Sequence, residues 1–254
     1  EAGLGNTTGV TNTFIGGSAG AANTTGSNNV AVGTNALDAN TTAPENVAVG
    51  SNAAGSTTTG GNNIAIGYSA LAANTTGNTN VAIGSYALDA NVAGDRNVAV
   101  GEEALSAMNP SGNVDTYNTA IGYNAGISTT TGVSGTFCGA AAGAGVTTGN
   151  RNTFLGHGCG YTTTTGQNNI MIGYHARASA STTHNELVIS GESGVGKGQS
   201  TGFISPGGGG VYQGNNSADW SRTSDRRIKK NIVDNNVGLE VIKDIRVRNF
   251  DYRT

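Results

Sequence analysis

Charged and large apolar side chains are both scarce in this sequence. Lys, Arg, Asp and Glu together make up 11% of the 254 residues, and aromatic residues make up 6%. The low charge argues against a disordered chain that self-repulsion keeps open. The scarcity of large apolar residues excludes an ordinary globular core, although a chain of this length normally builds one. With 42 glycines and many other small residues, the composition indicates a repeated structure instead.

Other absences narrow the possible locations and partners. No apolar run approaches the length of a membrane span, so we expect no insertion into a membrane. The chain shows no secretory signal and begins at Glu1 rather than Met, which predicts a fragment or a processed product. Residues 1–222 carry 5 Lys and Arg against 11 Asp and Glu, with no basic stripe, so nucleic acid is not an expected partner. Residues 223–254 carry 8 Lys and Arg against 5 Asp and Glu, which indicates a separate module.

The stretch LVISGESGVGKGQST, residues 187–201, comes close to a phosphate-binding loop. Gly191 to Lys197 fit the pattern G-x-x-x-x-G-K, but the next position needs Ser or Thr to hold Mg²⁺ and is Gly198 here. Such a loop also leads into a helix, whereas Pro206 and the glycines after it break one. We therefore predict a Gly-rich linker, with no nucleotide bound at Lys197.

A glycine recurs with a constant period along most of the chain. The spacing is 17 residues, except for a single gap of 21 between Gly101 and Gly122, where the extra residues fall around MNPSGNVD. A constant period with one local insertion is typical of a solenoid. The repeat positions are Gly16, Gly33, Gly50, Gly67, Gly84, Gly101, Gly122, Gly139, Gly156 and Gly173, with Ser190 in the equivalent place.

Each repeat carries the pattern N-[VIT]-A-[VI]-G-x-x-A. The β-branched residues alternate with the middle Ala, which predicts a short strand. Two short strands and two turns fit into 17 residues, so we predict an all-β fold over residues 1–190, a parallel β-roll or β-helix solenoid. We expect the β-branched residues, and the Ala three after the glycine, to point inward. The Asn four before the glycine recurs from Asn12 to Asn169, with Gly135 as the lone exception before Glu186 ends the series, and it should form an amide ladder.

In this arrangement the middle strand residue faces away from the core. It is usually Ala, but it becomes Phe14, Phe137, Phe154 and Met171 toward the ends of the array. An exposed apolar row needs covering. Packing against identical chains around a cyclic axis provides that cover, so we predict a homotrimer.

The segments SNNVAVGTNAL, GNNIAIGYSAL and NTNVAIGSYAL resemble the head repeats of trimeric autotransporter adhesins. They resemble still more the repeat arrays of phage and bacterial tail-fibre proteins. The resemblance covers residues 1–190 and implies a trimeric fibre segment of a virion tail. Its partners would be a host-surface receptor, either glycan or protein, and other tail or fibre proteins. A bacterial cell-surface adhesin is the alternative, and a glycan-depolymerising tail spike is disfavoured because no long acid-bearing loop interrupts the coils.

After a predicted linker and fibre end over residues 191–223, Ser224 begins the stretch SDRRIKKNI. It resembles the opening of the endosialidase-type intramolecular chaperone, S-D-x-R-x-K-x-N-I, and every fixed position matches. In that family the module trimerises, assists folding of the fibre and cleaves itself off beside the Ser. The resemblance makes Ser224 the nucleophile and Lys229 the base. It assigns supporting roles to Asp225, Arg227 and Asn231.

The family's module extends beyond what residues 224–254 contain, so we expect an incomplete chaperone that forms a small α+β segment. Apart from possible self-cleavage there, we predict no enzyme activity. A Ser hydroxyl needs a neighbouring base, and Lys can serve where nearby cations lower its pKa. The competing interpretation is that SDRRIKKNI is only a solvated basic strand.

Aromatic and imidazole side chains just after the repeat glycine should point outward. They could bind a receptor, although ordinary surface decoration is the competing interpretation. These candidates are Tyr68, Tyr86, Tyr123, His157, Tyr174 and His175.

Cysteine and histidine are two further residue types that could form a site. Cys138 and Cys159 take inward positions in neighbouring coils, which leaves open free buried thiols, the favoured interpretation, and a disulfide. The histidines, including His184, have no metal-ligand spacing with carboxylates, so we predict no metal and no other cofactor.

Overall fold

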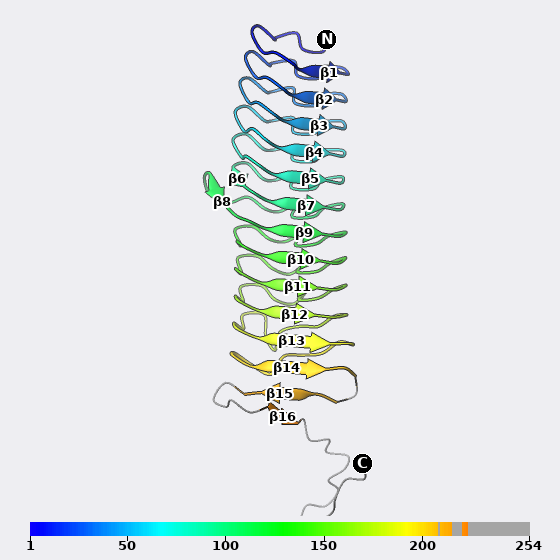
Figure 1. The fold of residues 1–254 in the computed structure, drawn as a ribbon, viewed down its shortest axis with the longest axis vertical. Coiled ribbons are helices and arrows are strands. Elements are labelled where there is room, and N and C mark those ends of the chain that lie inside the picture. Colours follow the sequence, from blue (N-terminus) through cyan, green and yellow to red (C-terminus); the bar gives the residue numbers. More distant parts are fainter. Residues whose placement is uncertain (208, 215–219, 223–254) are drawn as a thin grey trace, which may run out of the picture. The chain divides into compact units, whose positions relative to one another are not determined.

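A computed structural model describes residues 1–207, 209–214 and 220–222, and every regular element in them is a strand (Figure 1). Fourteen strands form a single sheet, while β6 and β8 pair separately. No helix of the described chain is long and apolar enough to cross a membrane. The strands are β1 (Thr13–Ile15), β2 (Val30–Val32), β3 (Val47–Val49), β4 (Ile64–Ile66), β5 (Val81–Ile83), β6 (Gly94–Asp95), β7 (Val98–Val100), β8 (Val114–Asp115), β9 (Thr119–Ile121), β10 (Thr136–Cys138), β11 (Thr153–Leu155), β12 (Ile170–Ile172), β13 (Leu187–Ser190), β14 (Gly202–Ser205), β15 (Val211–Gln213) and β16 (Trp220–Arg222).

Strands β1 to β14 of the sheet pair in parallel, so each coil of the chain lies on the next (Figure 1). Val47 of β3 pairs with Ile64 of β4, and hydrogen bonds join residues 17 positions apart throughout the stack. The step is 21 residues between β7 and β9, where Val98 pairs with Thr119. The additional residues leave the stack and contain β8, which pairs with β6 of the preceding coil. The predicted all-β solenoid of 17-residue coils is therefore confirmed.

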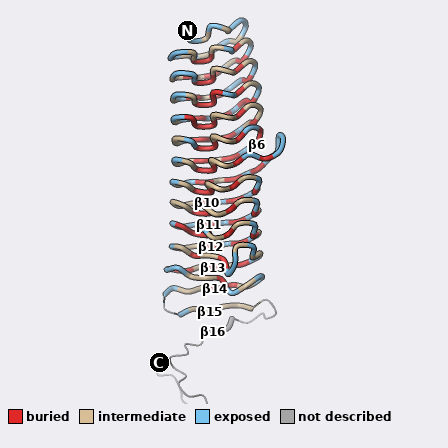
Figure 2. Tube along the Cα trace, turned by 180° about the vertical axis from the view of Figure 1, so that it is seen from behind, coloured by how far each residue is buried: buried red, intermediate tan, exposed pale blue. Residues whose placement is uncertain are grey.

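The prediction of which strand face lies inside was wrong. The middle residue is buried, so Ala65 and Phe137 are at most 1% exposed, whereas Ile64 and Ile66 on either side of Ala65 are each 37% exposed. Seen from behind in Figure 2, buried segments recur at the same place in successive coils. A coil this short encloses so little space that one side chain per strand fits inside. The small residue takes that position, and the two β-branched residues point outward.

The side of each coil that lies opposite the strand forms the other wall of the core. Its inward residues are the third and fourth after the repeat glycine. The third residue is buried as predicted, as at Ala70. The fourth residue compensates for the volume of the middle strand residue: coils with Ala in the strand have Leu or Ala there, and coils with Phe have Gly. In the single Ala coil that has Gly126, the ring of Phe137 from the next coil fills the space. The Phe and Gly pairs are Phe14 with Gly20, Phe137 with Gly143, and Phe154 with Gly160.

The repeat glycine is required by backbone conformation and by close packing between coils. At Gly33 the φ angle is +138°, and a β-carbon would lie 2.5 Å from the carbonyl oxygen of Gly50 in the next coil. A side chain is disfavoured by both conditions, so glycine recurs wherever the strand turns onto the opposite wall.

The predicted amide ladder is present. The backbone N–H of Asn63 donates to Asn46 Oδ1 (2.9 Å), and Asn63 Nδ2 donates to the carbonyl of Gly77 (2.8 Å). The ladder ends at buried Glu186, whose N–H donates to Asn169 Oδ1 (2.9 Å). Each side chain thus satisfies two backbone groups of the next coil, as Asn63 does for Gly77 and Asn80, which fixes the register of the two coils.

A second amide column, not predicted, follows seven residues after the repeat glycine. In it Asn40 Nδ2 donates to Asn23 Oδ1 (2.7 Å) and to the carbonyl of Ala43 (3.2 Å). The column also contains Asn74 and Asn91. Where threonine replaces Asn, the buried hydroxyl finds no protein partner among the described residues, at Thr57, Thr129 and Thr163.

The two cysteines are free thiols with different surroundings. Cys159 takes the place of a buried Ala, and burial raises the pKa of its thiol to about 12. Cys138 stands at an outward strand position and is half-buried, so the expectation that both thiols point inward was wrong for Cys138.

The sheet continues past residue 190 into the segment predicted to be a linker. Strand β14 pairs in parallel with β13, and β15 and β16 follow in antiparallel order. Phe203 of β14 aligns with Val188 of β13 and is 7% exposed, so it covers the end of the core. The predicted α+β segment, residues 224–254, lies outside the described residues.

Candidate functional site

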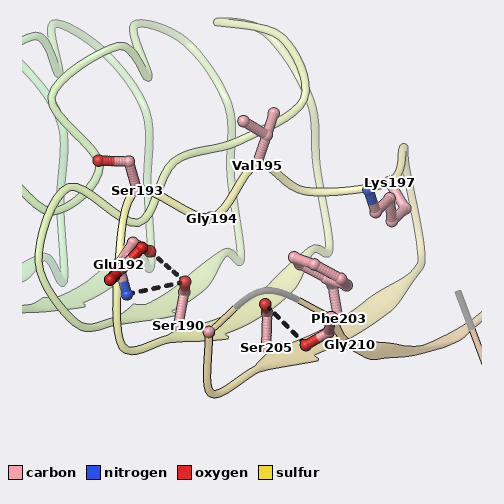
Figure 3. Close-up of a pocket in the computed structure, with 11 residues that line it drawn as sticks. Ser190, Glu192, Ser193, Gly194, Val195, Lys197, Phe203, Ser205 and Gly210 are labelled. Carbon is pink, nitrogen blue, oxygen red and sulfur yellow. Dashed lines mark hydrogen bonds between the residues drawn. The ribbon is translucent and has the colours of Figure 1, made fainter. Parts of the chain in front are cut away.

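The loop that resembles a phosphate-binding motif connects β13 to β14 without a helix (Figure 3). Several of its backbone N–H groups already have acceptors within the protein. Gly191 donates to the carbonyl of Ser205 (3.1 Å), Gly196 to the carbonyl of Arg177 (2.9 Å), and Gly198 to a carboxylate oxygen of Glu186 (2.7 Å). A phosphate cradle needs these groups free and aimed at the ligand.

Lys197 does not point into a ring of loop amides either. Its Nζ lies 4.5 Å from the centroid of the Phe203 ring, a cation–π contact (Figure 3). The open hollow beside it measures about 460 Å³ and also receives Glu192, whose carboxylate would repel phosphate. The geometry around Lys197 therefore offers nothing to a nucleotide.

The receptor-facing candidates occupy three separate places along the solenoid. Tyr68, Tyr123 and Tyr174 are 52%, 56% and 54% exposed. His157 is exposed and His175 is half-buried. The coils bring Tyr68 next to Tyr86, and His157 next to Tyr174 and His175, while Tyr123 makes no ring contact with another described residue. The assignment of these residues to a receptor stays a prediction.

His157, Tyr174 and His175 form a stack of near-parallel rings. The centroid of His175 lies 4.3 Å from that of Tyr174 and 5.3 Å from that of His157, with interplanar angles of 11° and 7°. Tyr161 packs against His175 at 5.4 Å, and Arg177 Nη1 donates to the Tyr161 hydroxyl at 3.5 Å. Sequence reasoning missed Tyr161 and Arg177, which lie later in their coils than the residues just after the glycine.

A glycine permits this stack. A β-carbon on Gly158 would stand 2.5 Å from Cδ2 of His175. Most other coils carry a side chain at the position of Gly158, so the imidazole of His175 occupies space that is filled elsewhere in the solenoid.

Tyr86, which packs against Tyr68, lies beside a small hollow of about 240 Å³. The hollow is lined by Tyr86, Asp89, Glu103, Ser106 and Ala107. Burial, followed by the nearby charge of Glu103, raises the pKa of Asp89. Sequence reasoning missed both acids because each is isolated in a chain of low charge. Aligning the repeats under one another would have found them, since Glu103 lies one coil after Tyr86 and Ser106 one coil after Asp89.

The residues assigned to self-cleavage lie outside the described part of the chain. They are Ser224 and Lys229, with Asp225, Arg227 and Asn231 in support. Within the described ranges, no group of three or more His, Cys, Asp or Glu side chains is placed to hold a metal ion. Comparisons with protein-family models, with curated proteins and with solved structures find no match for this chain.

Proposed function

We propose that this protein is a structural attachment protein, a homotrimeric fibre segment that presents a recognition surface to a host. The observation that carries the proposal is an apolar surface along the strands. The residues on either side of the middle strand residue form two outward columns, which we name the strand wall. One column is Val, Ile, Leu and Cys138 throughout, and the other is Val, Ile and Leu except for four threonines, Thr13, Thr119, Thr136 and Thr153. Its most exposed members are Ile15, Leu155, Ile121 and Ile170, at 58%, 47%, 44% and 44%.

The strand wall replaces the middle strand residues as the surface expected between chains. A column of exposed apolar side chains is costly in water and marks an interaction surface. The stripe repeats with each coil, so an identical chain alongside can match it coil for coil. Closed cyclic symmetry lets every copy cover its wall, and three copies are the number that the repeat resemblance implies.

Recognition is assigned to the aromatic groups around Tyr86 and His175. Both lie after the repeat glycine, on the turn that leads away from the strand wall. Packing through the strand wall therefore leaves these side chains available for a receptor, either glycan or protein. We place the protein in the tail of a virion, with a bacterial cell surface as the alternative; mass spectrometry of purified particles against surface-labelled cells separates the two.

The trimer is tested by light scattering coupled to size exclusion. The wild-type chain should elute at three times its mass of 25.2 kDa. The double variant Ile66→Lys/Ile83→Lys places charges on the strand wall and should shift the protein to smaller species. Ser51→Lys, on the turn after a repeat glycine, is the matched control and should remain trimeric. A stable, folded monomer of the wild type would overturn the proposal.

Self-cleavage belongs to the same proposal and rests on the resemblance of residues 224–232. In a chain extended to a complete chaperone module, cleavage beside Ser224 should follow trimer formation. Ser224→Ala should give an intact chain that still trimerises, and Lys229→Ala should slow cleavage by roughly 10²–10⁴, the usual contribution of a general base. Mass spectrometry measures both. Undiminished cleavage in Ser224→Ala would contradict the assigned nucleophile.

A further inference from the structure

The hollow beside Tyr86 brings acidic side chains from two coils together on the surface. Tyr86 and Asp89 come from one coil, and Glu103 and Ser106 come from equivalent positions in the next. Tyr86 and Glu103 are the second residues after their repeat glycines, and Asp89 and Ser106 are the fifth. Because the coils stack in register, the hollow is fixed by the backbone of the solenoid and not by a long loop.

The carboxylates of this hollow lack a cationic partner in the described part of the chain. Within the described residues, the ion pair that the structure shows joins Arg96 to Asp115, away from the hollow, and involves neither Asp89 nor Glu103. Oδ1 of Asp89 is itself shielded from solvent, so a ligand in the hollow reaches the remaining oxygens of the two acids. An ionised carboxylate accepts several hydrogen bonds and donates none, so these oxygens favour a ligand that brings hydrogen-bond donors.

An aromatic ring supplies the apolar side of the same hollow. Tyr86 is held by Tyr68 of the preceding coil, with ring centroids 5.2 Å apart and planes at 81°. A carboxylate can only accept hydrogen bonds, and a tyrosine offers both an apolar face and a hydroxyl. A sugar ring matches this combination, because its hydroxyls donate while its C–H face covers the aromatic ring. An ammonium group is best bound when several aromatic faces enclose it, and Tyr86 is the one aromatic residue among the lining residues.

We propose that the hollow formed by Tyr86, Asp89, Glu103 and Ser106 binds one uncharged sugar unit of a host-surface glycan, a site that rests on the proposed attachment function. Sugar hydroxyls donate to Asp89 and Glu103, and a C–H face lies on Tyr86. Sialic and uronic acids bring a carboxylate that these two acids repel, so acidic glycans are rejected. The volume of about 240 Å³ suits a single ring, since pockets for drug-sized ligands begin at roughly 300 Å³.

The test is binding of the purified protein to an immobilised panel of glucose-, galactose- and mannose-terminated glycans, amino-sugar glycans and sialic- or glucuronic-acid-terminated glycans. The wild type should bind at least one neutral class and no acidic class. The double variant Asp89→Asn/Glu103→Gln keeps the side-chain shapes but weakens both acceptors. Its affinity should fall about tenfold or more, as expected for hydrogen bonds to charged groups.

Two substitutions provide matched controls. Asp38 occupies the position of Asp89 in an earlier coil, and burial raises its pKa too, but the next coil has Asn52 where the hollow has Glu103. Glu102 adjoins Glu103 but does not line the hollow. Asp38→Asn and Glu102→Gln should leave binding unchanged.

Three results would overturn the site: no binding to neutral glycans, a preference for acidic or amino-sugar glycans, or a double variant that binds like the wild type. If the wild-type trimer adheres to host cells and the double variant adheres equally, attachment stands and uses another surface. If the wild-type trimer adheres to no host cell, the proposed function itself fails.

Discussion

The ring of Phe137 occupies the place where Gly143 would carry a side chain: a β-carbon on Gly143 would lie 2.5 Å from Cδ1 of Phe137. The coil of Ala65 shows the reciprocal arrangement, with Leu71 at the position of Gly143. Core volume is therefore balanced between one strand residue and one residue of the opposite wall, within most coils and, at Gly126, between neighbouring coils.

This balance predicts that the pair can be exchanged. Gly143→Leu alone should overpack the core and lower the free energy of unfolding by about 1–3 kcal/mol or more. Phe137→Ala alone should cost about 3–5 kcal/mol through the cavity it leaves. The double variant should be more stable than the sum of the two losses allows, since it recreates the pair Ala65 and Leu71. Denaturant unfolding of all four proteins measures the coupling, and strictly additive losses would contradict it.

Removal of one ladder amide should destabilise two coils at once. Asn63→Ala leaves the N–H of Asn80 without its acceptor, whereas the carbonyl of Gly77 keeps Asn74 Nδ2 as a donor. An unsatisfied buried group costs about 1–3 kcal/mol, so the expected loss is roughly 1–3 kcal/mol. Asn63→Asp keeps the acceptor for Asn80 and should lose less at a pH where the acid is protonated.

The neighbouring Asn62 is the control for this measurement. Its side chain is exposed, and its left-handed backbone, with φ of 60°, is one that glycine accepts. Asn62→Gly should change stability by well under the loss seen for Asn63→Ala. Equal losses at the two positions in thermal unfolding would show that the ladder bonds add nothing.

Stability should fall in alkali because of Cys159. Burial raises the pKa of its thiol from an ordinary 9.0 to about 12. The folded protein keeps the proton longer than the unfolded chain does, so the contribution is full below pH 9 and is lost as pH rises toward 12. The loss amounts to at most roughly 4 kcal/mol at about 1.4 kcal/mol per pH unit. Cys159→Ala, which restores the residue of most other coils, should flatten this part of the stability curve. Identical slopes for both proteins between pH 9 and 12 would contradict the burial argument.

Lys197 should bind no nucleotide, because the surrounding amides are engaged and Glu192 shares the hollow. Titration calorimetry with ATP and Mg²⁺ should give no saturable heat. Lys197→Ala should only weaken the contact with Phe203, at a cost of about 0.5–1 kcal/mol for an exposed cation–π pair. Saturable binding that disappears in Lys197→Ala would reverse this conclusion.

The period, the parallel register and the first amide ladder could be predicted because one residue type marks each of them in nearly every coil. The direction of the strand side chains could not. In Val-Ala-Val the residues on both faces are apolar, so alternation alone does not say which face is inside. The deciding quantity is the volume between the two walls, and it is visible only when Leu71 is seen opposite Ala65.

The candidate site was predictable only in part. Tyr68 and Tyr86 could be found because they follow the marker glycine directly. Asp89 and Glu103 carry no repeat signal, and they meet because one coil lies on the next. The glycines of residues 191–201 were the reason for predicting a linker there. The same glycines are compatible with a further coil, since small residues fit wherever two backbone segments approach closely.

The 21-residue step between β7 and β9 has a practical meaning for engineering. The added residues lie between β7 and β9, where they leave the stack after Asn109 and rejoin it before Thr119, while Val98 and Thr119 pair as any other neighbours do. Strand register is therefore indifferent to the length of this excursion. A β-carbon at Gly112 would meet no atom within 4 Å, so a foreign peptide grafted there would project from the side of the solenoid, with its returning stem anchored by the pairing of Asp115 with Asp95 of the preceding coil.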